Sequence, residues 1–520
     1  MQRSLVHISG EESIYFSTSS PYKVSFSLTM VLGSIPGTAQ LLAAILALGY
    51  AIISIMSKKG SSYPPQVPGL LPWVGPFIDF TFRRSEFIIL CEKKYGPVFR
   101  LLLGGRGITI VGSSEAVHNV LFSDFRALTN RAQNYEHLSV LGSDSSLLPK
   151  LHEIAVREIF PILDRHLSKR NLGKVTPGFA EIVFNTLKRF TGNDQVSLKR
   201  SVTQPLYVAT NMIVLGSRFS SDTYNDYITF LNSLPNRLSR SPFWSFPSSR
   251  ALERLRQHIS KHLEAADISN SDDTLTASTL KVFKAPGFPR SGGVTLFLAL
   301  MLALHINIFN ISFWLITWLL ANPVALAAVR DEIDRAVRED FGSIQTFLAE
   351  ATPENLESPS FALLHSAILE TLRLATMLTG MRLAECDCEL KDGERTVQIS
   401  KGEYVVIFSR AVHHDEASYP GGHKFMADRF MEYKGQGNMV HVPSKTYFPF
   451  GAGKHLCKGR FLIIYQLKVL VTIYLSLFDV TPVPQKGSSE WVPPQPSAKS
   501  LNVIHPNEDV FVKLRPRFGL

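Results

Sequence analysis

The chain has 520 residues, of which 45% are hydrophobic and 19% are charged, and Lys plus Arg exceed Asp plus Glu by 54 − 44 = 10. This composition excludes a largely disordered chain, because disordered segments combine low hydrophobicity with high net charge. The basic surplus is spread out, without the clustered basic and aromatic residues of nucleic-acid-binding proteins, so no nucleic-acid partner is expected. The four cysteines form neither a disulfide framework nor a zinc-binding spacing, which favours reducing surroundings.

Residues 35–56, IPGTAQLLAAILALGYAIISIM, carry no charge. A helix of this length spans a hydrocarbon layer roughly 30 Å thick, so we predict one transmembrane helix after an N-terminal extension at residues 1–34. A cleaved signal peptide is one alternative, although its apolar region would be shorter and nearer a basic terminus. A buried core helix is the other. Lys58 and Lys59 follow the span directly and favour a cytosolic catalytic part.

Residues 57–77 contain this basic pair and prolines at positions 64, 65, 68, 72 and 76. Proline fixes φ and removes a backbone donor, so the stretch is unsuited to a helix or a central strand. We predict a stiff hinge between the membrane and a catalytic domain at residues 78–520. Near the start of that domain, glycines in KKYGPVFRLLLGGRGITIVG separate two β-type runs and predict a hairpin, and SSEAVHNVLF predicts the start of a helix.

Residues 294–323, VTLFLALMLALHINIFNISFWLITWLLANP, are uncharged and long enough to span a bilayer a second time. The polar residues at the centre, among them His305 and Asn307, would be penalised in lipid, so we favour a long helix buried in a helical domain. Positions 303, 307, 310 and 314 share one face at 3.6 residues per turn. A cofactor or substrate pocket is expected against that face.

Residues 358–375, SPSFALLHSAILETLRLA, begin with helix-opening residues and continue with apolar residues at helical intervals, which predicts another helix. On it, Glu370 and Arg373 are i,i+3 neighbours, and two interpretations stay open for them. An exposed ion pair would contribute roughly a few tenths of a kcal/mol. Alternatively, the carboxylate is buried and also bonds to Arg429, which lies in the segment HHDEASYPGGHKFMADRF.

Residues 448–461, FPFGAGKHLCKGRF, surround Cys457 with glycines and precede a strongly apolar predicted helix. A cysteine just before a helix gains from amide donors and from the positive end of the helix dipole, so we expect a lowered pKa and a thiolate. Zinc or an iron–sulfur cluster requires three or four nearby protein ligands, which this region lacks. A single metal-bound thiolate therefore indicates haem. An inert buried cysteine is the alternative.

The pattern Phe450-x-x-Gly453-x-His455-x-Cys457-x-Gly459 resembles the haem-binding loop of the cytochrome P450 family. This combination of residue types and spacings is far more specific than a lone glycine-rich loop.

Two further stretches also resemble motifs of that family. Glu370-x-x-Arg373 is similar to its E-x-x-R pair, and Ala-Asp-Arg-Phe at 427–430 is similar to its P-E-R-F stretch, with alanine in place of proline. The order of membrane span, hinge, hairpin, long central helix and cysteine loop agrees over nearly the whole chain. The resemblance implies a mainly α fold, with one large helical domain and a small β region, preceded by an N-terminal transmembrane helix.

Carried over by position, the resemblance makes Cys457 the axial ligand of haem b iron, whose thiolate favours O–O cleavage. It implies that His455 and Arg382 meet the haem propionates. Glu370, Arg373 and Arg429 are expected to lock the fold beneath the haem without a catalytic role. The other expected cofactor-binding positions of the loop are Phe450, Gly451, Gly453 and Gly459.

The resemblance also implies partners and a location. Electrons would come from NADPH through NADPH-cytochrome P450 reductase, and the protein would be a single-pass membrane protein of the endoplasmic reticulum with its catalytic domain in the cytosol. Lys454, Lys458 and Arg460 flank the ligand loop. They would receive an acidic reductase surface, or they are ordinary solvated residues.

The central helix departs from the family pattern. Most members carry an A-G-x-D/E-T-like run whose acid and threonine help to protonate bound dioxygen, whereas this chain has Ala-Leu-His-Ile-Asn at 303–307. Asn307 and His305 are therefore the candidates for proton delivery. The region ISFWLITWLLANPVALAAVRDEI is similar to the branch that contains prostacyclin synthase and the steroid 7α- and 12α-hydroxylases, in which the hydroxylases tend to carry asparagine at the position of Asn307.

Three functions remain open from the sequence. The first is a membrane-bound monooxygenase that uses O₂ and NADPH-derived electrons to oxidise a hydrophobic steroid- or terpenoid-like substrate, in secondary metabolite biosynthesis. The second is a haem-thiolate isomerase or dehydratase that acts on a lipid peroxide or endoperoxide without a reductase. The third is a non-catalytic haem or binding protein.

Overall fold

The structure, a computed structural model, describes residues 62–517 apart from short gaps at 70–74, 123–126, 193–194, 217–218, 220, 239–245, 267–273, 435–436, 486 and 501. Contacts divide the chain into residues 1–58 and residues 59–520, and all the described residues belong to the second unit. The predicted extension at 1–34 and the predicted transmembrane helix at 35–56 lie outside the described residues.

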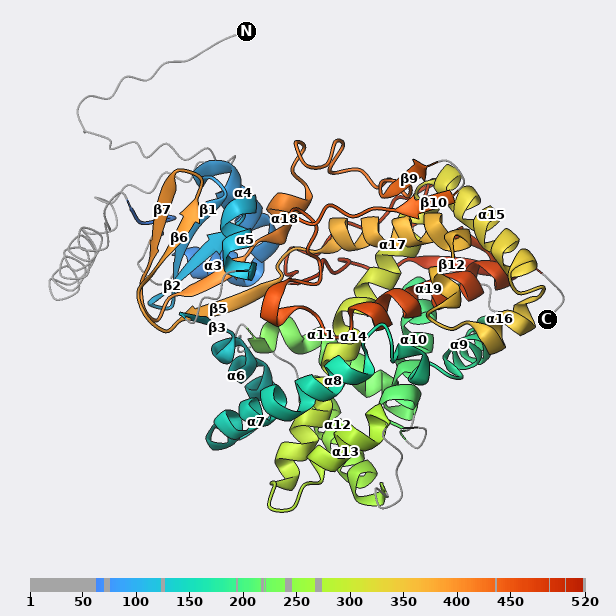
Figure 1. Ribbon diagram of the computed structural model, residues 1–520, viewed down its shortest axis with the longest axis horizontal. Helices are drawn as coiled ribbons and strands as arrows, with labels where there is room; N and C mark the ends of the chain where they lie inside the picture. The colour runs from blue at the N-terminus through green and yellow to red at the C-terminus, as the bar shows by residue number, and fades with distance from the viewer. Residues whose placement is uncertain are drawn as a thin grey trace, which may run out of the picture. The chain divides into compact units, whose positions relative to one another are not determined.

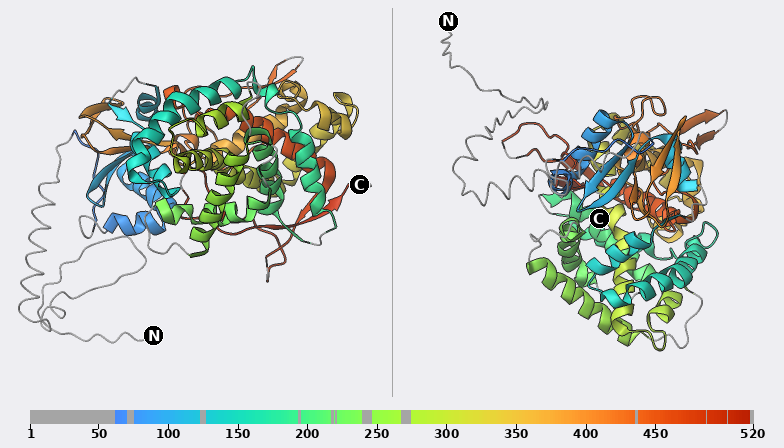
Figure 2. Two further views of the ribbon diagram at one scale, coloured as in Figure 1. Left: turned by 90° about the horizontal axis from the view of Figure 1, so that it is seen from below. Right: turned by 90° about the vertical axis from the view of Figure 1, so that its left-hand side faces the viewer.

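Helices form most of this unit (Figures 1 and 2). The α-helices are α3 (Gly75–Phe82), α4 (Arg84–Tyr95), α5 (Ser114–Phe122), α6 (Arg131–Val140), α7 (Leu148–Ile154), α8 (Phe160–His166), α9 (Phe179–Leu187), α10 (Leu198–Val214), α11 (Tyr224–Leu238), α12 (Phe246–Ala265), α13 (Leu275–Phe283), α14 (Arg290–Leu320), α15 (Pro323–Glu339), α16 (Ile344–Glu350), α17 (Ala362–Ala375), α18 (Ser409–His413) and α19 (Arg460–Leu477). A π-helical turn at Ala155–Ile159 joins α7 to α8.

The strands are short. They are β1 (Val98–Leu103), β2 (Arg106–Val111), β3 (Leu128–Thr129), β4 (Val196–Ser197), β5 (Gly380–Ala384), β6 (Cys388–Asp392), β7 (Arg395–Ile399), β8 (Tyr404–Ile407), β9 (Met431–Lys434), β10 (Gly437–Val440), β11 (Phe478–Pro482) and β12 (Phe511–Pro516). The largest sheet has the order β1-β2-β8-β5-β3, with β2 and β8 parallel and its other neighbours antiparallel. Its β1 and β2 form the predicted hairpin. A mainly α domain with a small β region is therefore confirmed.

Helix α14 lies at the centre of the helical part. It contacts α6, α10, α12, α13, α15, α17 and α19. Its long apolar stretch gives it the length and hydropathy of a membrane span, as is also true of α19, but 78% of that stretch is buried inside the protein. A helix that is hydrophobic on all sides needs apolar surroundings, and here neighbouring helices provide them. The preference for a buried helix over a second membrane span is confirmed.

The predicted hinge at 57–77 is partly incorporated into the folded unit. The backbone of Arg100 in β1 donates to Pro65 and accepts from Val67, at 2.9 and 2.8 Å. Val67 is buried, and α3 already begins at Gly75. The prolines exclude a central strand, as expected, but they allow this segment to pair along the outer edge of a sheet. Residues 62–67 and 75–77 thus belong to the domain and do not form a free spacer.

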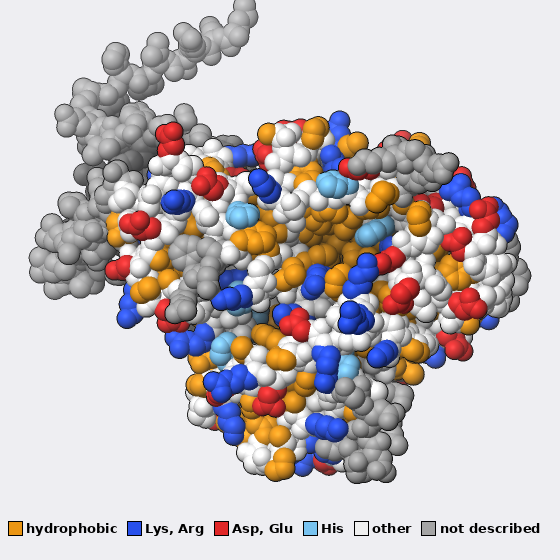
Figure 3. Space-filling view, viewed as in Figure 1, with side chains coloured by type: hydrophobic (Ala, Val, Ile, Leu, Met, Phe, Trp, Pro, Cys, Tyr) orange, Lys and Arg blue, Asp and Glu red, His pale blue; other side chains and the backbone are white. Residues whose placement is uncertain are grey.

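Figure 3 shows one face of the molecule. Lys and Arg side chains are mixed with Asp and Glu on this face and form no continuous basic stripe there. The net charge of +10 is consistent with such a mixed surface.

Candidate active site around Cys457

The cysteine loop folds by local hydrogen bonds. The Cys457 amide donates to the Phe450 carbonyl at 2.9 Å, and the Gly451 amide donates to the Phe448 carbonyl at 2.9 Å. A 3₁₀ turn at Gly453–His455 follows, and α19 begins at Arg460. These bonds hold Cys457 just ahead of a helix, as the sequence predicts.

The glycines of the loop differ in backbone conformation and in the space around them. Gly451 and Gly453 have φ values of 67° and 61°, which side-chain-bearing residues rarely adopt. A Cβ on Gly453 would also clash with the Leu121 carbonyl oxygen, so the loop packs directly on the backbone of the last turn of α5. A Cβ on Gly459 would meet no described atom within 4 Å. The first two positions serve the fold of the loop, and the third adjoins open space.

Burial is the main influence on the Cys457 thiol. It raises the pKa of this thiol, while the Gly459 amide and the charges of Arg460 and Lys458 lower that pKa by less. The helix end therefore lowers the pKa of Cys457 as expected, but burial has the larger effect, so the net shift for the thiol alone is upward and opposite to the prediction. A bound metal cation supplies the charge that deprotonates a coordinating thiol.

Glu370 is the centre of a buried network. Its carboxylate accepts two hydrogen bonds from Arg373, both at 2.8 Å, and is also bonded by the Arg429 Nε at 2.9 and 3.0 Å. The side chains of Glu370 and Arg373 are fully buried. The remaining N–H groups of both guanidinium groups donate to backbone carbonyls. Arg373 donates to the Gly422 carbonyl at 2.8 Å, and Arg429 donates to the Pro420 carbonyl at 2.7 Å. The surface-pair interpretation does not hold, and the network fastens α17 to the segment before β9.

Arg382 and His455 lie close enough to interact. Arg382, on β5, is buried and donates to the Met381 carbonyl at 3.1 Å. Burial lowers the pKa of Arg382 to about 10, and burial followed by the charge of Arg382 lowers the pKa of His455 to about 4. The side-chain amide of Asn130 lies 3.2 Å from His455 Nδ1. Within the described chain Arg382 has no carboxylate partner, which leaves a buried cation suited to an anionic group.

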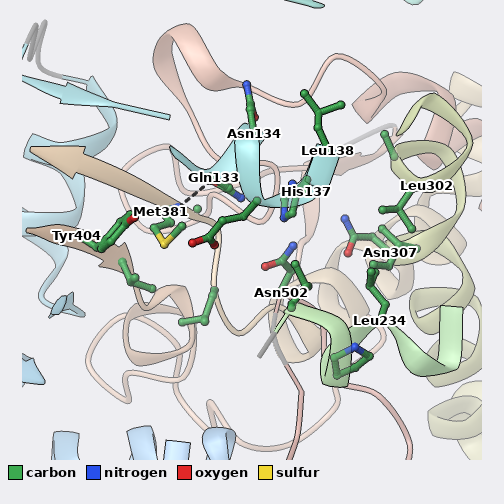
Figure 4. Close-up of a pocket in the computed structure, with 18 of the residues that line it drawn as sticks. Gln133, Asn134, His137, Leu138, Leu234, Leu302, Asn307, Met381, Tyr404 and Asn502 are labelled. Atoms are coloured by element: carbon green, nitrogen blue, oxygen red, sulfur yellow. Dashed lines mark hydrogen bonds between the residues drawn. The ribbon is translucent and has the colours of Figure 1, made fainter. Parts of the chain in front are cut away.

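A cavity of about 730 Å³ lies against Cys457. This volume falls in the range of small-molecule sites, roughly 300–1,000 Å³. The cavity is lined mainly by apolar side chains from α3, α6, α11, α14, β1, β5 and the C-terminal segment after β11. Figure 4 shows part of it, with Leu138, Leu234 and Leu302 around the polar side chains.

On α14, the predicted face lines the cavity only in its first part. Ala303 and Asn307 border the cavity. Further along, Asn310 donates to the Ile306 carbonyl at 2.9 Å and the Trp314 indole donates to the Ile504 carbonyl at 2.8 Å, so both serve internal packing. The Asn307 amide has no hydrogen-bond partner among the described residues and faces the cavity in Figure 4.

His305 lies on the other side of the same helix. It is fully buried, its Nδ1 donates to the Met301 carbonyl at 2.7 Å, and its ring is surrounded by Tyr207, Tyr227 and Phe309. Burial lowers its pKa to about 4. Two residues along a helix correspond to about 200° of rotation, so His305 and Asn307 face nearly opposite directions. His305 does not line the cavity, so the predicted role of His305 in proton delivery to a ligand there does not fit its position.

Several polar residues at this cavity were missed by sequence reasoning, and three of them are drawn together in Figure 4. Gln133 and His137 come from α6, and Asn502 comes from the C-terminal segment. Figure 4 shows His137, Asn307 and Asn502 around the same space. No motif marks them, because their position depends on tertiary contacts such as the bond from the Met377 amide to the Asn502 carbonyl at 2.8 Å.

The comparisons with known proteins agree with this geometry. The family model described as Cytochrome P450 matches residues 65–278 and 294–506 of the chain. The chain belongs to the cytochrome P450 family. As a member of this family it is a haem-thiolate oxidoreductase of the monooxygenase type.

Its relatives include sterol hydroxylases. The chain is 21% identical to the cholesterol 7-alpha-monooxygenase of Cricetulus griseus over 88% of this chain and 94% of that protein. It is 22% identical to the 24-hydroxycholesterol 7-alpha-hydroxylase of Homo sapiens over 88% of this chain and 96% of that protein. The predicted relation to the steroid 7α-hydroxylase branch is confirmed.

A solved structure has the same fold. The chain matches the retinoic acid bound cyanobacterial CYP120A1 with a TM-score of 0.68 at 20% identity, over 88% of this chain and all of the other. The cytochrome P450 fold, mostly helical with a small β region, is thus established.

The residues around the cavity fit the haem of the family. Among the described residues, the Cys457 thiol borders the cavity, open space adjoins Gly459, and the buried cation of Arg382 lies near His455 and lacks a carboxylate partner. Cys457 would hold the iron, and Arg382 with His455 would hold the propionates. When bound, the haem supplies the activation of dioxygen for insertion into a substrate C–H bond.

Proposed function

We propose that the chain is a membrane-bound monooxygenase that hydroxylates or otherwise oxidises a hydrophobic steroid- or terpenoid-like substrate with O₂ and NADPH-derived electrons, in secondary metabolite biosynthesis. The observation that carries this proposal is the largely apolar cavity that reaches Cys457 on one side and Asn307 on another. An apolar lining with few polar groups is typical of sites that bind a rigid hydrophobic molecule and fix its orientation by single contacts. The sterol named for several relatives belongs to that class.

Asn307 is proposed to position a water molecule beside the reacting oxygen. Its amide both donates and accepts, and within the described residues it is not engaged by another side chain. An amide does not titrate, so the water carries the proton and Asn307 orients it.

NADPH-cytochrome P450 reductase is the proposed electron donor, and the basic residues around the cysteine loop are its proposed docking site. Lys458 is bonded to Asp164 at 2.6 Å, and Arg460 donates to the Cys457 carbonyl at 3.0 Å. Both side chains are therefore fixed beside the ligand loop, and Asp164 offsets part of the charge of Lys458. An acidic partner surface would be steered to them by charge, with a rate that falls as salt rises.

Residues 35–56 are proposed to anchor the chain as a single span in the endoplasmic reticulum, with the catalytic domain in the cytosol. The hydropathy of that segment and the basic pair after it support this topology. Fractionation of cells that express the full chain, with protease protection of the two ends, tests it. Recovery of the full chain in the soluble fraction would refute the anchor.

The experiment for the activity combines the purified full chain with reductase, NADPH and panels of sterols and terpenoids. We expect substrate-dependent NADPH consumption and a product that gains one oxygen atom from ¹⁸O₂. Turnover of a lipid hydroperoxide without reductase, and no oxygen incorporation with any sterol or terpenoid, would instead identify an isomerase or dehydratase. Absence of both activities would indicate a binding protein.

A further inference from the structure

Arg84 is a buried cation in the wall of the cavity. It opens α4 directly after α3, is only 4% exposed, and lines the same cavity as Cys457. Its guanidinium lies over the ring of Phe80, 4.6 Å from the ring centre, and Phe80 lines the cavity too. A guanidinium stacked on an aromatic ring is held in position while its edge keeps its N–H donors.

Among the buried arginines of the described chain, Arg84 is the one whose side chain has no hydrogen-bond or ion-pair partner. Arg373 is bonded to Glu370, and Arg100 donates to Glu403 at 2.8 Å and to Gln66. Within the described residues the side chain of Arg84 makes no hydrogen bond or ion pair, and its Nε is buried without an acceptor. Burying an unpaired cation costs stability, so a chain that retains one needs a compensating contact that the protein itself does not supply.

The haem does not account for this cation. Its propionates are assigned to Arg382 on β5 and His455 in the cysteine loop, which interact with each other. Arg84 belongs to a different part of the wall, where the Ser85 amide donates to the Ala498 carbonyl of the C-terminal segment at 3.0 Å. Burial alone lowers the pKa of Arg84, with no contribution from the charge of Arg382 or His455.

The charged residues that line the cavity also favour an anionic ligand. Arg106, a second cation that lines the cavity, is exposed and donates to the Tyr404 hydroxyl at 2.9 Å. Glu136, on α6, is the one carboxylate among the described lining residues, and it has no bond with Arg84. Arg84 and Arg106 supply two positive charges, whereas Glu136 supplies one negative charge and already has another partner. This balance favours an anionic ligand.

We propose that Arg84 binds the carboxylate of the substrate, and that the substrate is an acid with a sterol or triterpenoid skeleton. This inference rests on the proposed function. A carboxylate accepts two hydrogen bonds from a guanidinium, which fixes orientation as well as position. The apolar skeleton then fills the space between Arg84 and Cys457, and the end that turns toward Cys457 is determined by the end that Arg84 holds.

The test compares each acid with its methyl ester, which keeps the skeleton and removes the charge. The haem-loaded full chain is titrated with 3β-hydroxy-5-cholenoic acid, oleanolic acid and their methyl esters. Binding is followed by the shift of the haem Soret band and, independently, by equilibrium dialysis. We expect at least one acid to bind about ten-fold or more tightly than its ester, and Arg84→Met to remove that preference while Arg84→Lys keeps part of it.

Arg83→Met is the matched control. Arg83 is the neighbouring residue, but its side chain is 60% exposed and pairs with Glu86 at 3.0 Å. This variant should keep the preference for the acid. Thermal unfolding without ligand adds a second measurement, because Arg84→Met should raise Tm by removing an unpaired cation, whereas a structural role would lower Tm.

The inference is overturned if no acid binds better than its ester, or if Arg84→Met keeps the preference. A loss of binding to phosphatidylserine vesicles in Arg84→Met, with the acid preference unchanged, would overturn it in favour of a lipid phosphate. These measurements need no reductase. If the protein prefers the acid but forms no NADPH-dependent product, the carboxylate site at Arg84 is supported and the proposed monooxygenase reaction is refuted.

Discussion

The polar groups of the Glu370–Arg373–Arg429 network differ from the polar groups that line the cavity in whether the protein itself supplies their hydrogen-bond partners. In the Glu370–Arg373–Arg429 network, the carboxylate and both guanidinium groups are bonded within the protein. In the cavity, Asn307 and Arg84 have no hydrogen-bond partner within the described residues. A buried polar group that is fully bonded contributes to the fold, whereas one that is unbonded is available to a ligand. Substitutions in the network should therefore affect folding most, and substitutions at the cavity should affect ligand binding and chemistry most.

Cys457→Ala should have the largest effect on the cavity side. It removes the one thiol among the described lining residues, so the reduced protein with carbon monoxide should lose the thiolate-type Soret shift completely. Cys91→Ala is the control, because Cys91 is buried in α4 and is not a lining residue. Its variant should keep the spectrum. A Cys457→Ala protein that retains both haem and the shift would refute the assignment.

Glu370→Ala should have the largest effect on the fold side. It leaves Arg373 and Arg429 without their carboxylate, which costs about 3–5 kcal/mol for a buried pair. We expect a low soluble yield and poor haem incorporation. Glu86→Ala breaks an ion pair of the same i,i+3 spacing, in which the side chains are 53% and 60% exposed, and should cost under about 1 kcal/mol. Equal midpoints of chemical unfolding for the two variants would contradict the division.

Gly453→Ala should destabilise the cysteine loop by more than its conformation alone predicts. A positive φ costs a side-chain-bearing residue roughly 1–2 kcal/mol, and here the new Cβ would also clash with the Leu121 carbonyl oxygen. Gly393→Ala has a similar φ of 64° with open space around the Cβ, and should show the conformational cost alone. Unfolding free energies that are equal for the two variants would mean that the loop can move away from α5.

Asn307→Leu should change chemistry and leave folding almost intact. With the substrate and active reductase, we expect less product per NADPH and more peroxide release, because the water is no longer positioned. Asn310→Leu, on the same helix but bonded to Ile306, is the control and should keep the wild-type ratio. If Asn307→Leu also keeps the ratio of product to NADPH, Asn307 has no part in proton delivery.

The sequence by itself determined the local parts of this protein. Cys457 with its glycines, the hairpin at β1 and β2, and the burial of α14 follow from residue type and spacing over short distances. The rotation of about 200° between positions 305 and 307 of a helix also places His305 and Asn307 on opposite faces, although the comparison with the family motif made both of them candidates for proton delivery. These features depend on backbone geometry, which is nearly independent of the rest of the chain.

Only the tertiary structure decided which polar groups are bonded. Glu370–Arg373 and Arg83–Glu86 have the same spacing and similar chemistry, yet one pair is fully buried and the other is exposed. Asn502 reaches the cavity because its carbonyl accepts the Met377 amide, and Arg84 is buried beside residues far away in the sequence. Burial and partnership depend on contacts between distant segments, and the free energy of a polar group depends on those contacts more than on its identity.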